Sequence, residues 1–424
     1  MLLISLLLNS LIVSDPSSSF YNSKVNLLID SNGIIEKISK KKINKKGIRS
    51  IDFNSKKVSN GWFDFSANFC DPGFEFKEDL VSGVKLAYRS GFVDVLLKPD
   101  TNPIIQNKND ISYIIKKSQN KFCKIHPCAA VTKDFNGKNL NDIIDIFNAG
   151  AIAFTDYNES NNAELILNTL LYLKQFNGLY LSKPKYYPIS RGNVNESLNS
   201  EKAGLKGIPY ISETIAIKRD LSILEYTGGK IHFSGISTKE SVDLIRQAKK
   251  KGLNVTCDVP VYNLILDDSN ILNFDTNYKV DPPLRSNEDI NELLSGIDDG
   301  TIDVITSNHE PQDFDSKNCE FDKASFGIIS IQTFYSNILE LSRKIPFEKL
   351  LPTFTSNPRK ILGLETNKIE EGSFASLTIF DDEGSWDYNE ETNISKSFNS
   401  PWLNWSLKGK VKGVVVGKNF NFDE

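Results

Sequence analysis

Hydrophobic residues follow two different patterns along the 424 residues of the chain. At both ends, short apolar runs are separated by polar turns, which is typical of β-strands joined by hairpins. The apolar runs cover residues 2–8, 11–13, 25–29, 34–38, 375–380 and 409–417, and a turn signal lies at Asp30-Ser31-Asn32-Gly33. The two ends together therefore predict one composite β-sandwich domain, built from residues 1–57 and 366–424.

The segment between them, residues 58–365, alternates short apolar strands with helices, which is the pattern of βαβ units in an α/β fold. The predicted strands end near Asn68, Pro99, Val131, Asp156, Lys183, Ser237, Pro260 and Pro311. The predicted helices cover residues 78–89, 140–149, 163–175, 213–226, 238–251 and 288–297. Eight strands in about 250 residues fit a (β/α)8 barrel of the TIM type. A doubly wound open sheet is the alternative, but no Gly-x-Gly-x-x-Gly motif follows any of these strands.

Composition narrows the class of protein. A net charge of −4 and a pI near 5.7, without a dominant basic face, argue against nucleic acid as a partner. The apolar residues 2–13 lack a basic flank and a cleavage site and are too few to span a bilayer, so they predict strands and no membrane association. Five cysteines without metal-like spacing indicate reduced thiols in a cytoplasmic protein.

The stretch from Gly61 to Asp79 carries the most informative motif. It reads as a buried strand, a Pro-Gly turn and the acidic start of a helix. This stretch resembles the first barrel strand of the dihydroorotases, a family of cyclic amidohydrolases, in which Asp-x-His-x-His-x-Arg-Glu-Pro-Gly provides two metal-binding histidines. In the same frame this chain has Asp64, Ser66, Asn68, Cys70, Asp71, Pro72 and Gly73.

Further segments resemble the same family, so that the resemblance covers nearly the whole chain. They are residues 96–103, 231–238, 274–286, 299–305 and 318–327. The resemblance implies the barrel with its composite sandwich and a place in pyrimidine biosynthesis. It says nothing by itself about activity, because one fold hosts many functions.

The metal-ligand positions that the resemblance implies carry unsuitable side chains. They fall on Ser66 and Asn68, near Asp156 and Tyr157, on Ser182 or Lys183, and on Gly235 and Asn308. Zinc needs neutral imidazole, thiolate or carboxylate ligands, and of these positions Asp156 alone keeps a ligand of that kind. The three histidines of the chain, His126, His232 and His309, fall on none of the ligand positions. We therefore expect no cofactor, although zinc is the metal of the family.

The catalytic and substrate positions implied by the resemblance have changed as well. Asn308 stands where the family has the aspartate that accepts and returns a proton, which an amide cannot do. The implied substrate-pocket positions are Cys70 in place of Arg, Asp100 and Asp281 in place of Asn, Gln312 in place of His, and Phe326 and Gly327. Two added carboxylates would repel an anionic substrate. The catalytic set is therefore predicted to be vestigial.

Two rebuilt chemistries are alternatives. The carboxylates Asp64, Asp71, Asp100, Asp156, Asp258, Asp281 and Glu310 could crowd the barrel mouth as an acid-base pair or a Mg²⁺ or Ca²⁺ site. The interpretation that we favour is that they are solvated or paired with Lys98, Lys183 and Arg285. A Cys70 nucleophile with a His309 base is the weaker alternative, because no motif brings them together.

The preferred functional hypothesis is an inactive, dihydroorotase-like structural subunit. The resemblance implies aspartate transcarbamoylase as its first candidate partner, because inactive dihydroorotase-like subunits support that enzyme in some bacteria; self-association is the other. The alternatives are an active cyclic amidohydrolase with an atypical metal site and a sensor that binds a small ligand in the old pocket.

Overall fold

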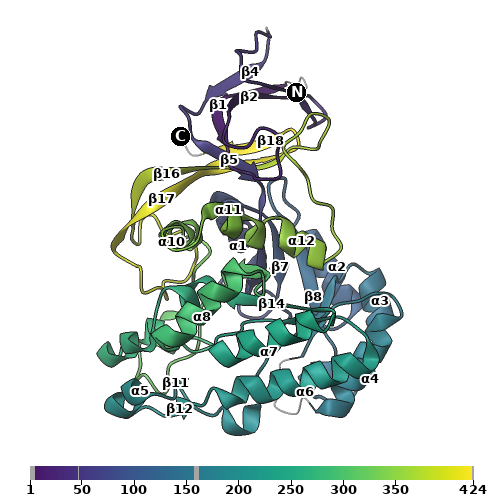
Figure 1. Ribbon diagram of the computed structural model, residues 1–424, viewed down its shortest axis with the longest axis vertical. Coiled ribbons are helices and arrows are strands. Elements are labelled where there is room, and N and C mark those ends of the chain that lie inside the picture. Colours follow the sequence, from purple (N-terminus) through teal and green to yellow (C-terminus); the bar gives the residue numbers. More distant parts are fainter. Residues whose placement is uncertain (1–4, 46, 157–161, 423–424) are drawn as a thin grey trace.

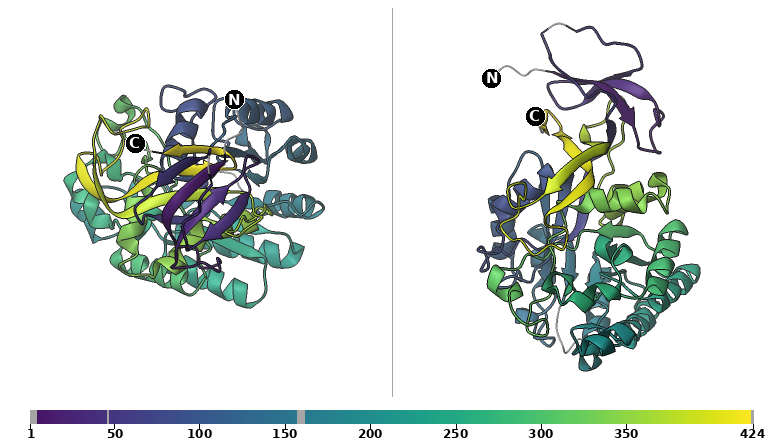
Figure 2. Two further views of the ribbon diagram at one scale, coloured as in Figure 1. Left: turned by 90° about the horizontal axis from the view of Figure 1, so that it is seen from above. Right: turned by 90° about the vertical axis from the view of Figure 1, so that its left-hand side faces the viewer.

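The computed structural model describes residues 5–45, 47–156 and 162–422. A parallel barrel surrounded by helices lies below a second, sheet-rich part in Figure 1, and the side view of Figure 2 shows the same two-part arrangement. Within those ranges, no helix combines the length and the apolar character needed to cross a membrane.

The barrel consists of eight parallel strands in the order β15-β14-β13-β10-β9-β8-β7-β6. Their bounds are β6 Trp62–Ala67, β7 Phe92–Leu97, β8 Lys124–Ala130, β9 Ala153–Thr155, β10 Tyr180–Ser182, β13 Ile231–Phe233, β14 Val255–Pro260 and β15 Val304–Thr306. The edge strands β6 and β15 approach each other through a parallel bridge between Ala67 and His309. The barrel is therefore nearly closed, and β6 is buried at every position because it is covered on both faces.

Helices cover the outside of the barrel. Their bounds are α1 Leu80–Arg89, α2 Lys108–Lys117, α3 Ile143–Asn148, α4 Ala163–Lys174, α5 Leu198–Ala203, α6 Ile211–Thr227, α7 Lys239–Lys250, α8 Asn287–Asp298, α9 Phe314–Lys317, α10 Phe334–Leu341, α11 Phe347–Leu350 and α12 Ser356–Ile361. Side-chain caps fix several of the helix starts: Asp79 accepts from the backbone N–H groups of Val81 and Ser82 in α1, and Ser286 accepts from that of Asp289 in α8.

The second sheet combines strands from both ends of the chain, with β5 beside β16 at the junction. Its strands are β1 Leu6–Val13, β2 Lys24–Ile29, β3 Ile35–Ser39, β4 Arg49–Asp52, β5 Lys57–Asn60, β16 Ser376–Tyr388, β17 Trp405–Val416 and β18 Asn419–Phe422. A small parallel pair, β11 Val194–Asn195 and β12 Gly207–Ile208, stands apart. Trp62 joins the two parts, because this fully buried ring of β6 packs 5.5 Å from Phe380 of β16.

The predicted fold class, a TIM-type barrel with a sheet-rich second domain, is confirmed. Some boundaries differ for local reasons. Helix α3 begins at Ile143 rather than at Leu140, because Leu140 forms a β-bridge with Thr132. Strand β13 ends at Phe233 rather than at Ser237, since Gly235 takes a left-handed conformation with φ +76° that ends the extended chain. The helices α2, α5, α9, α10, α11 and α12 were not predicted. Residues 2–4 of the first predicted run lie outside the described residues.

Candidate functional site

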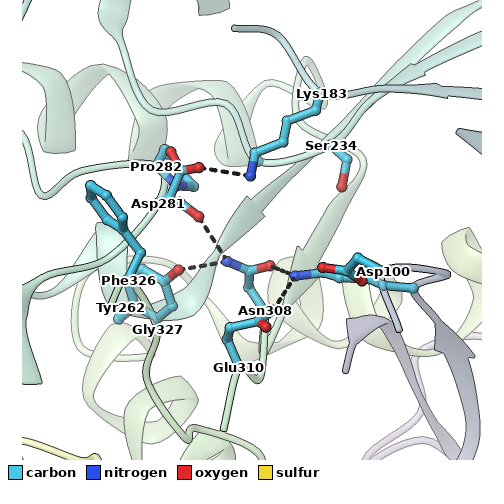
Figure 3. A pocket seen from close by; sticks show the side chains of 12 residues that line it. Asp100, Lys183, Ser234, Tyr262, Asp281, Pro282, Asn308, Glu310, Phe326 and Gly327 are labelled. Atoms are coloured by element: carbon cyan, nitrogen blue, oxygen red, sulfur yellow. Dashed lines mark hydrogen bonds and ion pairs between the residues drawn. The ribbon is translucent and has the colours of Figure 1, made fainter. Parts of the chain in front are cut away.

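A cavity of about 200 Å³ lies at the carboxyl ends of the barrel strands, where barrel enzymes hold their active sites (Figure 3). It is lined by Lys98, Asp100, Lys183, Ser234, Gly235, Tyr262, Asp281, Pro282, Asn308, Glu310, Phe326 and Gly327. Because β6 and β15 close the barrel beside each other, residues that follow β7 and β15 in the chain meet across this cavity.

Asn308 is the centre of the hydrogen bonds in the cavity (Figure 3). Its Oδ1 accepts from Lys98 Nζ at 2.6 Å and from Ser66 Oγ at 3.2 Å. Its Nδ2 donates to the hydroxyl of Tyr262 at 2.6 Å. Asn308 has φ +48°, a left-handed conformation that asparagine tolerates better than most residues. The amide is therefore held by donors and acceptors on both sides.

Lys98 and Glu310 form an ion pair beside Asn308. The Lys98 Nζ lies 3.3 Å from Glu310 Oε2, and Asn68 Nδ2 donates to Glu310 Oε1 at 3.1 Å. The side chains of Lys98 and Glu310 are only 15% and 24% exposed, so solvent screens this pair less than a surface pair.

Lys183 occupies the opposite wall and pairs with Asp281 at 2.7 Å, while Lys185 approaches the same carboxylate at 3.1 Å. Burial alone would raise the pKa of Asp281, but the two ammonium groups hold it well below its usual range. Ser182 points elsewhere, because its hydroxyl donates to Asp220 at 2.6 Å. Of the two candidates on this strand, Lys183 is therefore the residue that lines the cavity.

Asp100 differs from the other charged groups in the cavity. Its Oδ1 is buried and has no hydrogen-bond partner among the described residues. Burial, and then the negative charge of Glu310, raise its pKa to about 6. The carboxyl group of Asp100 therefore holds its proton to a higher pH than an ordinary aspartate does.

Of the remaining implied pocket positions, Cys70 and Gln312 lie off the cavity wall. The backbone N–H of Cys70 donates to Asn68 Oδ1 at 2.7 Å, and burial raises the pKa of its thiol. Gln312 is held between Lys77 Nζ at 2.8 Å and the carbonyl of Phe326 at 2.8 Å. Neither Cys70 nor Gln312 lines the cavity, whereas Phe326 and Gly327 do.

Asp156, the one ligand position with a carboxylate, also lies off the cavity wall. It accepts from the backbone N–H of Thr132 at 3.2 Å and from its hydroxyl at 2.5 Å, and burial raises its pKa to about 6. Tyr157 lies outside the described residues. At Gly235 the backbone N–H donates to Asp258 at 2.8 Å, and no side chain fills the ligand position.

The histidines belong to the protein interior. His126 Nε2 lies 2.8 Å from Asp94, and His232 Nε2 lies 2.9 Å from Asp258. His309 Nδ1 accepts from the backbone N–H of Ser330 at 3.2 Å, and burial lowers the pKa of its ring to about 3. With the high pKa of the Cys70 thiol, these contacts leave no support for a Cys70–His309 nucleophile.

The predicted crowd of seven carboxylates divides into two groups. Asp100, Asp281 and Glu310 line the cavity. Asp64 is buried against Ser307, whose N–H donates at 3.0 Å, and Asp71 pairs with Lys117 at 2.8 Å. Asp156 and Asp258 have the partners given above. One predicted pairing was wrong: Arg285 lies 3.8 Å from Glu213 and donates to Ser237, Asn195 and the carbonyl of Ile208.

Tyr262 and Ser234 are cavity residues that sequence reasoning missed. Tyr262 lies two residues after the end of β14, and Ser234 follows directly after β13. Polar residues just beyond barrel strands are the expected lining of such a site, so their position was the available signal.

The donor set does not fit zinc. Hydroxyl, amide and glycine stand at the positions of Ser66, Asn68, Asn308 and Gly235, and the Lys98 ammonium beside Asn308 would repel a metal. Across residues 5–45, 47–156 and 162–422, no group of three or more His, Cys, Asp or Glu side chains is placed to hold a metal ion.

Solved structures that share this fold include hydantoinases. The chain is similar to L-hydantoinase (dihydropyrimidinase) from Arthrobacter aurescens, with a TM-score of 0.86 at 18% identity over 98% of this chain and 95% of that one. A D-hydantoinase gives a TM-score of 0.82 at 19% identity over 98% and 95% of the two chains. At such identities the likeness shows the fold alone. No protein-family model matches the chain.

Sequence relatives are more specific. The dihydroorotase of Carboxydothermus hydrogenoformans is 38% identical over 392 residues, which cover 91% of each chain. The dihydroorotase of Trichlorobacter lovleyi is 33% identical over 415 residues, or 97% of each chain. Similarity at this level across almost the full length extends through both the barrel and the second sheet. The chain therefore belongs to the dihydroorotase family of cyclic amidohydrolases.

Proposed function

We propose that this chain is a catalytically inactive, dihydroorotase-like protein of pyrimidine biosynthesis that serves as a structural subunit, with aspartate transcarbamoylase as its partner. The observation that carries the loss of activity is the hydrogen-bonded group around Asn308. Lys98 and Ser66 donate to its amide oxygen, so the position of the family's proton acceptor is held by a neutral group that cannot take a proton.

The structural role rests on what is retained. The barrel, the second sheet and the packing of Trp62 between them are complete, while the chemistry of the strand ends has changed. A stable barrel without catalytic groups can still bury a standard interface of roughly 1,600 Å² with a partner. The other candidate partner for such an interface is a second copy of this chain.

The first test is metal content. Protein produced in zinc-supplemented medium, and analysed by mass spectrometry of its metals, should contain far less than stoichiometric zinc, and chelator should leave its melting temperature unchanged. A metal-dependent dihydroorotase purified in parallel is the control. One or two tightly bound zinc ions per chain would contradict the proposal.

The second test is turnover. Neither hydrolysis of dihydroorotate nor its formation from carbamoyl aspartate should exceed the rate without protein. Catalytic groups act as a unit, so Asn308→Asp alone should restore no activity.

The alternative function is an active cyclic amidohydrolase with an atypical site, which the buried Asp156 carboxylate with its raised pKa favours. Turnover that survives purification and disappears in Asp156→Ala would establish that alternative.

The third test concerns the partner. Co-expression with the aspartate transcarbamoylase of the same organism, followed by size-exclusion chromatography with light scattering, should give one peak whose mass is the sum of both proteins. Two separate peaks at micromolar concentration would contradict this partner. A peak at twice the mass of this chain would identify self-association instead.

A further inference from the structure

The Lys98 ammonium lies among side chains that come from three neighbouring strand ends. Its Nζ contacts Asn308 Oδ1 at 2.6 Å and Glu310 Oε2 at 3.3 Å, two residues that follow β15. From the end of β6, Ser66 donates to the same Asn308 oxygen at 3.2 Å, and Asn68 donates to the other Glu310 oxygen at 3.1 Å. Lys98 itself follows β7 directly.

We propose that Lys98 is the resident cation of this cavity, and that its ammonium group replaces the metal ion of metal-dependent family members as the link between the ends of β6, β7 and β15. An ammonium carries one positive charge and three N–H donors. It can therefore neutralise Glu310 and satisfy the amide oxygen of Asn308, which is the structural part of what a metal does. It cannot activate water as a metal does.

The changes at neighbouring positions agree with this role. The hydroxyl of Ser66 and the amide of Asn68 donate to the same two side chains that Lys98 contacts: Ser66 shares the Asn308 oxygen with Lys98, and Asn68 bonds to the second oxygen of Glu310. Without the ammonium, Asn68 would be the one side-chain donor left to the Glu310 carboxylate among the described residues, and Glu310 would face the Asp100 carboxyl, whose pKa it already raises, without a cation. Two adjacent carboxylates without a cation repel each other.

The test is chemical rescue of a cavity variant. Lys98→Ala removes the ammonium and opens space for a small amine, and it should lower the melting temperature by about 5–10 °C, as expected when one member of a partly buried pair is removed. Ethylammonium chloride should restore at least half of that loss, whereas sodium chloride at the same ionic strength should not. The readout is differential scanning fluorimetry and requires neither metal nor substrate.

Two variants serve as controls. Lys98→Met fills the space with an apolar chain, so it should be destabilised but should not respond to ethylammonium. Lys249→Ala removes a lysine of similar exposure that pairs with Asp303 at 2.7 Å outside the cavity, and it should show no rescue either. Equal responses of Lys98→Ala and Lys98→Met to ethylammonium would overturn the proposal, as would a Lys98→Ala variant with unchanged melting temperature.

A double-mutant cycle tests the same proposal if Lys98→Ala folds poorly. Lys98→Met, Glu310→Gln and their combination should be clearly non-additive, because the second substitution removes the carboxylate that the first one leaves without a cation. Additive shifts in melting temperature would show that Lys98 and Glu310 are not coupled, and would reject the assignment.

Discussion

The two ends of the barrel differ in how completely their buried carboxylates are paired. Near the N-terminal ends of the strands, the Asp94 carboxylate pairs with both His126 and Arg359, and Arg359 donates to the carbonyls of Gly61 at 2.8 Å and Thr355 at 2.7 Å. At the carboxyl ends, Asp100 has a buried oxygen without a partner among the described residues. The first end connects segments that are far apart in the sequence, which is a requirement of folding. The second end forms the wall of the candidate site, and Asp100 is one of its lining residues.

The largest effect on stability is expected from removing the Arg359–Asp94 ion pair near the N-terminal ends of the barrel strands. Arg359→Met leaves Asp94 and two carbonyls without their buried donor, and we expect it to reduce the free energy of unfolding by about 3–5 kcal/mol. Urea unfolding followed by circular dichroism measures this. Arg343→Met, which changes a surface arginine that pairs with Glu340, should be nearly neutral. If both variants lost a similar amount of unfolding free energy, the buried Arg359 pair would be no more important for stability than a surface pair.

A smaller effect is expected in the pH dependence of stability. The folded-state pKa of His309, lowered to about 3, lies below its unfolded value near 6.5. The unfolded chain therefore binds the proton first as pH falls, so this residue makes stability decrease from pH 6.5 downwards by about 1.4 kcal/mol per pH unit.

His309→Gln isolates this contribution. Between pH 7 and pH 5, the variant should lose about 2 kcal/mol less stability than the original protein, measured by urea unfolding at each pH. Parallel pH curves for the two proteins would mean that the pKa of His309 is the same in the folded and unfolded states. Absolute stability at pH 7 is a separate quantity, because the substitution also changes the bond to Ser330.

The smallest effect on stability is expected for Asp100 at the carboxyl ends of the barrel strands. Its pH dependence is opposite to that of His309, because Asp100 makes the protein less stable as pH rises. The pKa of Asp100 is raised to about 6, above its unfolded value, so ionisation of this group costs the folded state stability as pH rises from 4 to 6. Asp100→Asn should therefore stabilise the protein by about 1 kcal/mol at pH 7.5 and leave it unchanged at pH 4. A loss of stability at pH 7.5 would indicate that the Asp100 carboxylate has a favourable partner.

Much of the fold could be predicted because it depends on local signals. Hydrophobic alternation, the Pro72-Gly73 turn and the polar caps at Asp79 and Ser286 report on short stretches of chain. Helix α2 was missed because its start depends on the Asn107 cap in a polar stretch with few apolar residues. Propensity alone is a weak guide to such short helices.

The candidate site was predictable in position but not in its contacts. The resemblance placed Asn308 at a strand end, yet its hydrogen bonds to Lys98 and Tyr262 join residues 210 and 46 positions apart. Arg285 was assigned to the mouth, but it bonds to Asn195 and Ser237 instead. The partners of a long side chain depend on which groups lie near it in the folded structure. A single sequence does not show which groups those are.

The pairing of β5 with β16 has a consequence for synthesis on the ribosome. Val58 of β5 lies opposite Ile379, which is added 321 residues later. At elongation rates of 5–20 residues per second, β16 is synthesised roughly 15–60 s after β5, and β5 cannot pair with it before then. During that time the apolar faces of β1 and β2 lack the strands that later cover them, including Leu377 and Val415. Chaperone dependence should therefore concentrate on the N-terminal strands of the nascent chain rather than on the barrel.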